Sequence, residues 1–69
     1  MLFAERLKLC RENRKWKQRE VAEADMLEMR LRSYQSYEQG EREPSIKKLI
    51  ALADFFDVTL DYLTGRTDQ

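Results

Sequence analysis

The stretch SYQSYEQGEREPS, residues 33–45, carries the strongest structural signals in the chain. Its two tyrosines are three residues apart, so in a helix both side chains lie on the same face. Gly40 follows them and can adopt the left-handed conformation that ends a helix. Pro44 then precedes Ser45, a residue type that often caps the start of a helix. The stretch therefore predicts a helix that ends at the glycine, a short charged loop and a new helix after the serine.

Apolar residues at helical spacing predict further helices on both sides of this stretch. The first covers about residues 2–14 and the second about residues 18–26. The helix after Ser45 carries a set of apolar residues on one face: Ile46, Leu49, Leu52, Ala53 and Phe56. Thr59 then caps a last short helix, which Gly65 closes.

The length and the composition favour a single small helical domain. The chain has 69 residues, enough for one modest core, with only two glycines and one proline. A sheet protein would need turn residues at shorter intervals. We therefore predict an all-α fold, a compact bundle of five helices, over residues 1–66, followed by a short tail at residues 67–69.

The composition also limits the kinds of site that the chain can hold. One cysteine and no histidine exclude a disulfide within the chain, a His/Cys metal site and a Ser-His-Asp triad. We expect no enzymatic activity, no metal and no cofactor, and no small-molecule substrate is evident. Charged residues interrupt the segment MLFAERLKLC, residues 1–10, so we expect no signal peptide, no membrane span and a cytoplasmic protein.

The charge is unevenly distributed, although the formal net charge is zero. Residues 1–19 hold seven Lys/Arg against two acids, whereas residues 20–69 hold six Lys/Arg against eleven acids. A local positive face is what a nucleic-acid phosphate backbone would sense. A solvated helix surface is the alternative interpretation of the same charges.

The order of the predicted helices resembles the Cro/cI-type (XRE-like) helix-turn-helix domain. The most specific motifs are SYEQGEREPS at residues 36–45 and LDYLTG at residues 60–65, and the resemblance covers about residues 3–65. It implies the lambda-repressor-like fold and a small transcriptional regulator that binds double-stranded DNA. The family's way of binding further implies a repressor that acts as a homodimer on a palindromic operator.

The resemblance also implies which residues read the bases. The helix that begins near residue 30 would be the recognition helix, lying in the major groove. With both tyrosines turned toward the core, the opposite face carries Leu31, Arg32, Gln35 and Ser36. Arg32 is suited to guanine, Gln35 to adenine and Leu31 to a thymine methyl group. The alternative is that these are ordinary surface or contact residues.

A second set of residues is suited to the DNA backbone. Gln18 lies at a helix start, where free N–H groups favour a phosphate, and Lys17 adds positive charge beside it. Gln39 and Arg42 are the candidates on the other side of the recognition helix. Lys15 and Lys17 stand where the family usually has a Gly and a Ser/Thr cap. In the alternative interpretation Gln18 only caps its helix, and Arg42 only pairs with a neighbouring glutamate.

Arg11 and Glu38 occupy positions where the family usually places an internal ion pair. Such a pair would join the first helix to the recognition helix. Breaking a buried ion pair costs roughly 3–5 kcal/mol. We therefore assign both residues to the architecture of the domain rather than to DNA contact.

The junction before the recognition helix departs from the family pattern. The segment ADMLEMRLRS, residues 24–33, contains no Gly and no capping hydroxyl before Arg32, and most of it favours helix. Either a longer turn survives, with Leu27 or Met29 reaching into the core, or residues 18–39 form one continuous helix. A continuous helix of about 33 Å could not fold back, so a second chain would complete the core in a swapped dimer. We expect the turn, because tertiary packing often overrides propensity.

The alternative function is a protein-interaction or antitoxin-like helical module with weak or no DNA reading. The zero net charge and the altered junction both leave room for it. DNA affinity that falls steeply with added salt would favour the regulator, because each neutralised phosphate releases counterions. Binding to a protein, without salt-dependent DNA binding, would favour the interaction module.

Overall fold

The computed structural model describes residues 2–67, so residues 68–69 of the expected tail lie outside the described residues. Within that range the chain forms five helices: α1 (Leu2–Asn13), α2 (Gln18–Ala22), α3 (Leu31–Gln39), α4 (Ile46–Phe56) and α5 (Leu60–Thr64). The described residues contain no strand, which confirms the predicted all-α bundle of five helices. None of these helices has both the length and the apolar character needed to cross a membrane.

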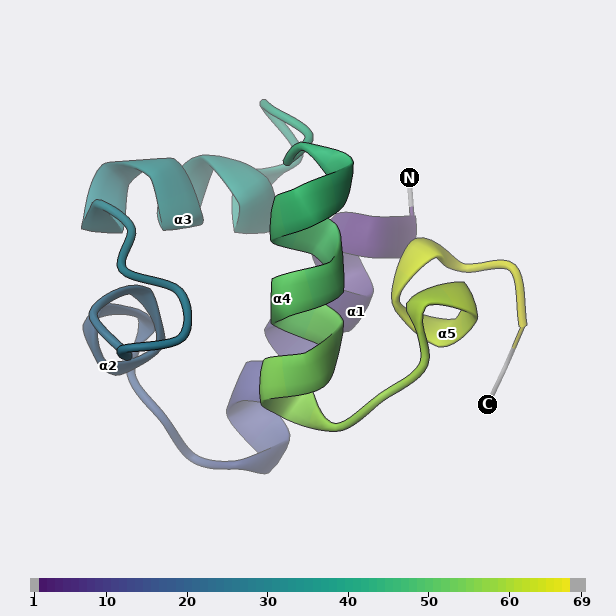
Figure 1. Cartoon of the computed structure of the whole chain (residues 1–69), viewed down its shortest axis with the longest axis horizontal. Helices are drawn as coiled ribbons and strands as arrows, with labels where there is room; N and C mark the ends of the chain where they lie inside the picture. Colours follow the sequence, from purple (N-terminus) through teal and green to yellow (C-terminus); the bar gives the residue numbers. More distant parts are fainter. Residues whose placement is uncertain (1, 68–69) are drawn as a thin grey trace.

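α1 is the helix around which the bundle is organised. It packs against α3 and against α5, while α2 packs against α3 and α4 packs against α5. Figure 1 shows α4 crossing in front of α1, with α2 and α3 on one side and α5 on the other. This arrangement places α2 and α3 together at one end of the molecule.

The core draws on every helix and on the junction before α3. Its buried members are Phe3, Leu7, Cys10, Val21, Ala22, Leu27, Tyr34, Tyr37, Leu52, Ala53, Phe56 and Leu63. Trp16 closes the core from the loop between α1 and α2, with its ring centroid 5.2 Å from that of Phe55. Burial of such apolar and aromatic area is the main force that holds a domain of this size together.

Local capping signals explain where the C-terminal helices begin and end. Ser45 Oγ accepts a hydrogen bond from the Lys48 N–H at 3.2 Å, and Thr59 Oγ1 accepts one from the Tyr62 N–H at 3.0 Å. Gly40 ends α3 in the left-handed conformation, with a φ of 76°. These contacts satisfy backbone groups that a helix end leaves without partners.

The junction before α3 is a turn, so the swapped dimer built on a continuous helix is not the arrangement of this structure. α2 ends at Ala22, and the predicted end near Met26 is wrong by four residues. Leu27 is only 1% exposed, and its burial draws the chain into the core. Glu28 then has a positive φ of 42°, so the backbone leaves the right-handed helical path at this residue. Tertiary packing has overridden a run of helix-forming residues.

Two contacts hold this turn against the rest of the domain. Lys48 Nζ of α4 donates a hydrogen bond to the Leu27 carbonyl oxygen at 2.8 Å. The Met29 N–H donates to the Ala22 carbonyl oxygen at 2.9 Å, and the Met29 side chain packs on the core. The turn is therefore attached to α4 at Leu27 and closed by the bond between Met29 and Ala22, although it contains no glycine.

The loop after α1 offers a test of backbone strain. Lys15 has a φ of 58°, a conformation that costs a residue with a Cβ roughly 1–2 kcal/mol. We expect Lys15→Gly to raise the free energy of unfolding by about 1 kcal/mol, less than the whole strain because glycine also frees the unfolded chain. Lys15→Ala keeps the Cβ and is the matched control. Urea unfolding midpoints that are equal for the two variants would show that this strain is absent.

Candidate nucleic-acid interface

α3 turns one face to the core and the other to solvent. Tyr34 is fully buried and Tyr37 is 8% exposed, as their spacing predicted. Arg32 is exposed on the opposite side, while Gln35 and Ser36 are partly exposed beside it. The structure thus brings the expected base-reading side chains onto one accessible surface of α3.

α3 lacks a side-chain cap at its N-terminus, whereas Gly40 caps its C-terminus. Arg30 is the N-cap residue and makes no side-chain capping bond. Leu31, the first helical residue, is partly exposed. Ser36 Oγ donates to the Arg32 carbonyl oxygen at 3.0 Å, so its hydroxyl proton is used within the helix. The Ser36 oxygen is left to act toward a ligand chiefly as an acceptor.

A chain of side-chain hydrogen bonds joins α1, α2 and α3. Arg11 Nε donates to Glu38 Oε2 at 2.6 Å, and Arg11 Nη2 donates to Glu38 Oε1 at 3.1 Å. Gln18 Nε2 donates to Glu38 Oε1 at 3.1 Å. Gln35 Nε2 in turn donates to Gln18 Oε1 at 3.1 Å. The chain therefore runs from the ion pair in the interior to the accessible face of α3.

The order of donors and acceptors in this chain fixes the orientation of both amides. An ionised carboxylate only accepts, so Gln18 must turn its NH₂ group to Glu38 and its oxygen to Gln35. Gln35 must then turn its own NH₂ group to Gln18. One N–H and the Oε1 of Gln35 are left uncommitted by these bonds. The Glu38 carboxylate thus fixes the orientation of the Gln35 amide indirectly, through the hydrogen bonds that Gln18 makes to both residues.

Arg11 and Glu38 make the central ion pair of this region. Their side chains are 14% and 3% exposed, and Arg11 Nη1 also donates to the Trp16 carbonyl oxygen at 2.9 Å. Burial alone would raise the pKa of the Glu38 carboxyl, but the hydrogen bonds it accepts, first that from Arg11, bring the pKa below its usual value. Burial raises the pKa of Tyr34, whose hydroxyl lies in the same environment. Glu38 is therefore ionised at neutral pH.

The lowered pKa of Glu38 gives stability a defined dependence on pH. A carboxyl whose pKa is depressed by folding stabilises the fold above its unfolded pKa of about 4.3, and that contribution is lost as the pH falls through the folded pKa. We expect the stability difference between wild type and Glu38→Gln to be constant from neutral pH down to about pH 5. Below that it should shrink toward zero. Unfolding by urea over this range measures it, and a difference that grows on acidification would contradict the assignment.

Most of the residues predicted to contact phosphate line one hollow beside the N-terminus of α2. It is lined by Lys8, Arg11, Lys17, Gln18, Glu38 and Gln39. Lys17 is exposed, and its backbone N–H donates to the Glu20 carboxylate at 2.7 Å, while no side chain caps the first turn of α2 as a Ser or Thr would. Arg42 is exposed in the loop after α3 and does not line this hollow.

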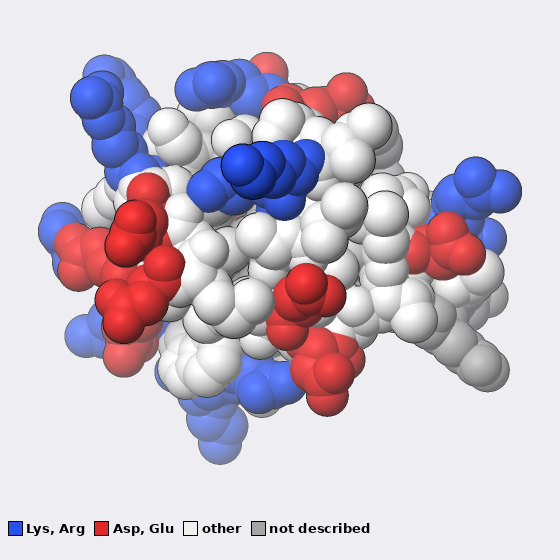
Figure 2. Space-filling view, in the orientation of Figure 1, with Lys and Arg blue, Asp and Glu red and all other residues white. Residues whose placement is uncertain are grey.

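Lys8 belongs to this set, although we did not predict it from the sequence. It lies on the exposed side of α1, and the hollow joins it to Lys17 and Gln39. The excess of Lys and Arg in residues 1–19 indicated a basic surface, but it did not show which of these cations lie on the same surface as α2 and α3. The face over α4, by contrast, carries basic and acidic side chains around a largely uncharged centre (Figure 2).

The remaining chemistry-bearing residues of the described chain form no reactive group. No cluster of three or more potential metal ligands occurs among residues 2–67. Cys10 is buried, and burial raises the pKa of its thiol. It is thus a neutral core residue at physiological pH.

Comparisons with known proteins agree with this geometry. A family model described as helix-turn-helix matches residues 7–63. The chain is 44% identical over 62 residues to the uncharacterized HTH-type transcriptional regulator YqaE of Bacillus subtilis, covering 90% of this chain and 52% of the relative. It is 40% identical over 65 residues to the HTH-type transcriptional regulator AnsR of the same organism, covering 94% and 54%.

A phage protein is among the relatives as well. The chain is 40% identical over 48 residues to the cryptic phage CTXphi transcriptional repressor RstR of Vibrio cholerae, covering 67% of this chain and 43% of the relative. The chain spans about half the length of the curated relatives that it matches. No solved structure gave a significant match.

Proposed function

The chain belongs to the Cro/cI-type helix-turn-helix family, and from that premise we propose that it reads double-stranded DNA as a small, non-enzymatic transcriptional repressor in the cytoplasm. The main support for the proposal is the series of side-chain hydrogen bonds from Glu38 through Gln18 to Gln35, which lies on the accessible face of α3. A solvated surface glutamine gains little from being held in one orientation. A side chain that reads a base gains from a fixed orientation, because its donor and its acceptor are then in place before DNA binds.

The orientation of Gln35 favours adenine as its base. Adenine offers an acceptor, N7, and a donor, the N6 amino group, side by side in the major groove. The uncommitted N–H of Gln35 can donate to adenine N7, and its Oε1 can accept from the N6 amino group. Its other N–H remains bonded to Gln18. Arg32, exposed one turn earlier, is suited to guanine O6 and N7. Leu31 and Ser36 complete the proposed reading surface.

The phosphate contacts would fix the position of α3 in the groove. Lys17, Gln18 and Gln39, together with Lys8, surround the hollow beside α2, and Arg42 lies in the loop after α3. Such contacts carry no sequence information of their own. Two copies of the domain would act as a homodimer on a palindromic operator, with half-sites about one helical turn, roughly 34 Å, apart.

The salt dependence of DNA binding tests this proposal against a protein-interaction module. We expect the logarithm of the affinity for a duplex to fall linearly with the logarithm of salt concentration. Lys17→Gln should reduce the steepness by about 0.9, the contribution of one phosphate contact. Lys47→Gln, which removes an exposed cation of α4, is the matched control and should leave the slope unchanged. Absence of salt-dependent binding in the folded protein would favour the interaction module instead.

A further inference from the structure

A buried carboxylate and an accessible amide lie at the two ends of one short series of hydrogen bonds. The Glu38 side chain is only 3% exposed, and its Oε1 accepts from Gln18 Nε2 at 3.1 Å. Gln18 Oε1 accepts from Nε2 of the partly exposed Gln35, also at 3.1 Å. We call these two bonds the amide series. It connects a charge in the interior with a side chain on the outer face of α3.

The direction of the amide series is set at its buried end. The amide of glutamine has an oxygen that accepts and an NH₂ group that donates, so Gln18 and Gln35 could bond to each other in either order. An ionised carboxylate only accepts, and it therefore excludes one of the two orders. The charge of Glu38 thus decides which group of Gln35 is used inside the protein and which groups remain for a ligand.

Arg11 holds the carboxylate in one position. Its Nε donates to Glu38 Oε2 at 2.6 Å, and its Nη2 donates to Glu38 Oε1 at 3.1 Å. At the shorter distance a second donor could not face Arg11 Nε, so an acceptor is required in the place of Oε2. A neutral amide at this position would therefore put its oxygen there and its NH₂ group in the place of Oε1, toward Gln18.

Glu38→Gln would accordingly reverse the amide series. The new NH₂ group would donate to Gln18, which would turn its oxygen inward and its own NH₂ group to Gln35. Gln35 would then accept through Oε1 and keep both of its N–H groups for DNA. Two donors match guanine, whose N7 and O6 both accept, whereas one donor and one acceptor match adenine.

We propose, on the basis of the proposed function, that Glu38 determines the base preference of α3 although it touches no base. Its negative charge fixes the direction of the amide series and thereby selects adenine over guanine at Gln35. Glu38 is a positioning residue that acts through Gln18. This role is separate from the contribution of its ion pair with Arg11 to stability, since a purely structural ion pair has no effect on which base is preferred.

A pair of duplexes that differ only in adenine or guanine at the base read by Gln35 tests the proposal. That base is the one for which Gln35→Ala loses its preference. We expect the wild type to bind the adenine duplex roughly 5- to 150-fold more tightly than the guanine duplex. Glu38→Gln should prefer the guanine duplex. An unchanged preference for adenine, or an equal loss of affinity on both duplexes, would overturn the proposal.

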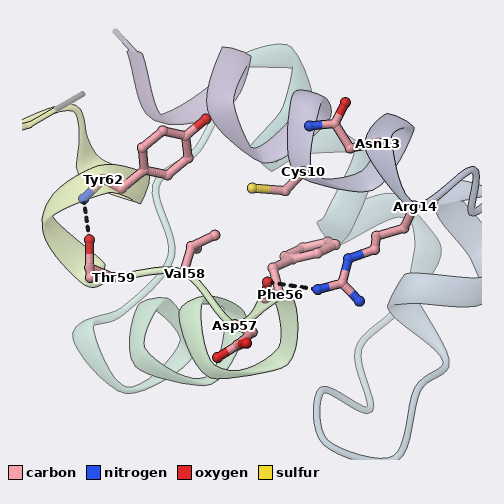
Figure 3. A pocket seen from close by; sticks show the side chains of 8 residues that line it. All are labelled: Cys10, Asn13, Arg14, Phe56, Asp57, Val58, Thr59 and Tyr62. Atoms are coloured by element: carbon pink, nitrogen blue, oxygen red, sulfur yellow. Dashed lines mark hydrogen bonds between the residues drawn. The ribbon is translucent and has the colours of Figure 1, made fainter. Parts of the chain in front are cut away.

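Two further variants separate the direction of the amide series from stability. Thr59 Oγ1 accepts a hydrogen bond from the Tyr62 N–H at the start of α5 (Figure 3), on the side of α4 away from α3. Thr59→Ala removes this cap and lowers the stability, but should keep the preference for adenine. In the Gln18→Ala background the amide series is interrupted, so adding Glu38→Gln should no longer change the preference. A change of equal size in that background would overturn the role of Gln18.

Scalar couplings across hydrogen bonds, measured by NMR on the free protein, show the direction of the amide series without DNA. In the wild type we expect a coupling between Gln35 Nε2 and the Gln18 side-chain carbonyl carbon. In Glu38→Gln the coupling should join Gln18 Nε2 to the Gln35 side-chain carbonyl carbon. The wild-type pattern in the folded variant would overturn the proposal. If the wild type bound no DNA, the proposed function would fail, whereas the couplings would still decide whether Glu38 sets the direction.

Discussion

Replacing Glu38 with alanine is expected to lower the free energy of unfolding by about 3–5 kcal/mol. The substitution removes a carboxylate that is 3% exposed and leaves Arg11, only 14% exposed, without its counter-charge. It also removes the acceptor that holds Gln18. A domain of this size has a total stability of only about 3–10 kcal/mol, so much of the protein would be unfolded at 37 °C. Urea unfolding followed by circular dichroism measures the loss.

The chain supplies a matched control for this substitution. Glu23 pairs with Arg19 at 3.3 Å on the surface of the molecule, where the two side chains are 62% and 66% exposed. Solvent screens such a pair, and we expect Glu23→Ala to change the stability by less than about 0.5 kcal/mol. If Glu38→Ala lost no more than Glu23→Ala, the ion pair between α1 and α3 would not have the structural role assigned to it.

Replacing Gln35 with alanine is expected to weaken binding to the preferred DNA site by about 1–3 kcal/mol, or roughly 5- to 150-fold. The reason is the loss of one acceptor and one donor that are already oriented by Gln18. The loss should be specific to one base pair in each half-site. Affinities measured on the preferred duplex, and on duplexes with that pair replaced, give the size of the effect.

The same duplexes serve as the control for Gln35→Ala. On a duplex in which the proposed adenine is replaced, wild type and variant should bind with similar affinity, because the contact is already absent. Gln18→Ala should reduce the preference for adenine as well, although Gln18 itself lies on α2 and acts through its hydrogen bonds to Glu38 and Gln35. A uniform loss on all duplexes would mean that Gln35 positions the protein but does not read a base.

The elements that could be predicted from the sequence are those with a local cause. The end of α3 at Gly40 and the start of α4 after Ser45 depend on residues within one helical turn, and both predictions are confirmed. The end of α2 was predicted too late, because it depends on the burial of Leu27 against parts of the chain that are distant in sequence. Helix propensity is a property of each residue by itself, so it does not reflect contacts with distant parts of the chain.

The candidate site shows the same division. The side of α3 that carries Arg32 and Gln35 follows from the spacing of the tyrosines. The bond between Gln35 and Gln18 could not be predicted, because those residues are seventeen positions apart and meet only when α2 packs on α3. The place of Lys8 beside Lys17 likewise depends on the angle between α1 and α2. The sequence indicates residue types, and packing decides which of them share a surface.

Selection of bound sequences from random duplex DNA tests the central claim most directly. The wild-type protein is compared with Arg32→Ala and Gln35→Ala, after each variant has been shown to fold. We predict that the wild type enriches a palindrome with half-sites about one helical turn apart, and that each variant relaxes a different base pair in each half-site. No enriched sequence from the folded wild-type protein would contradict the proposed function.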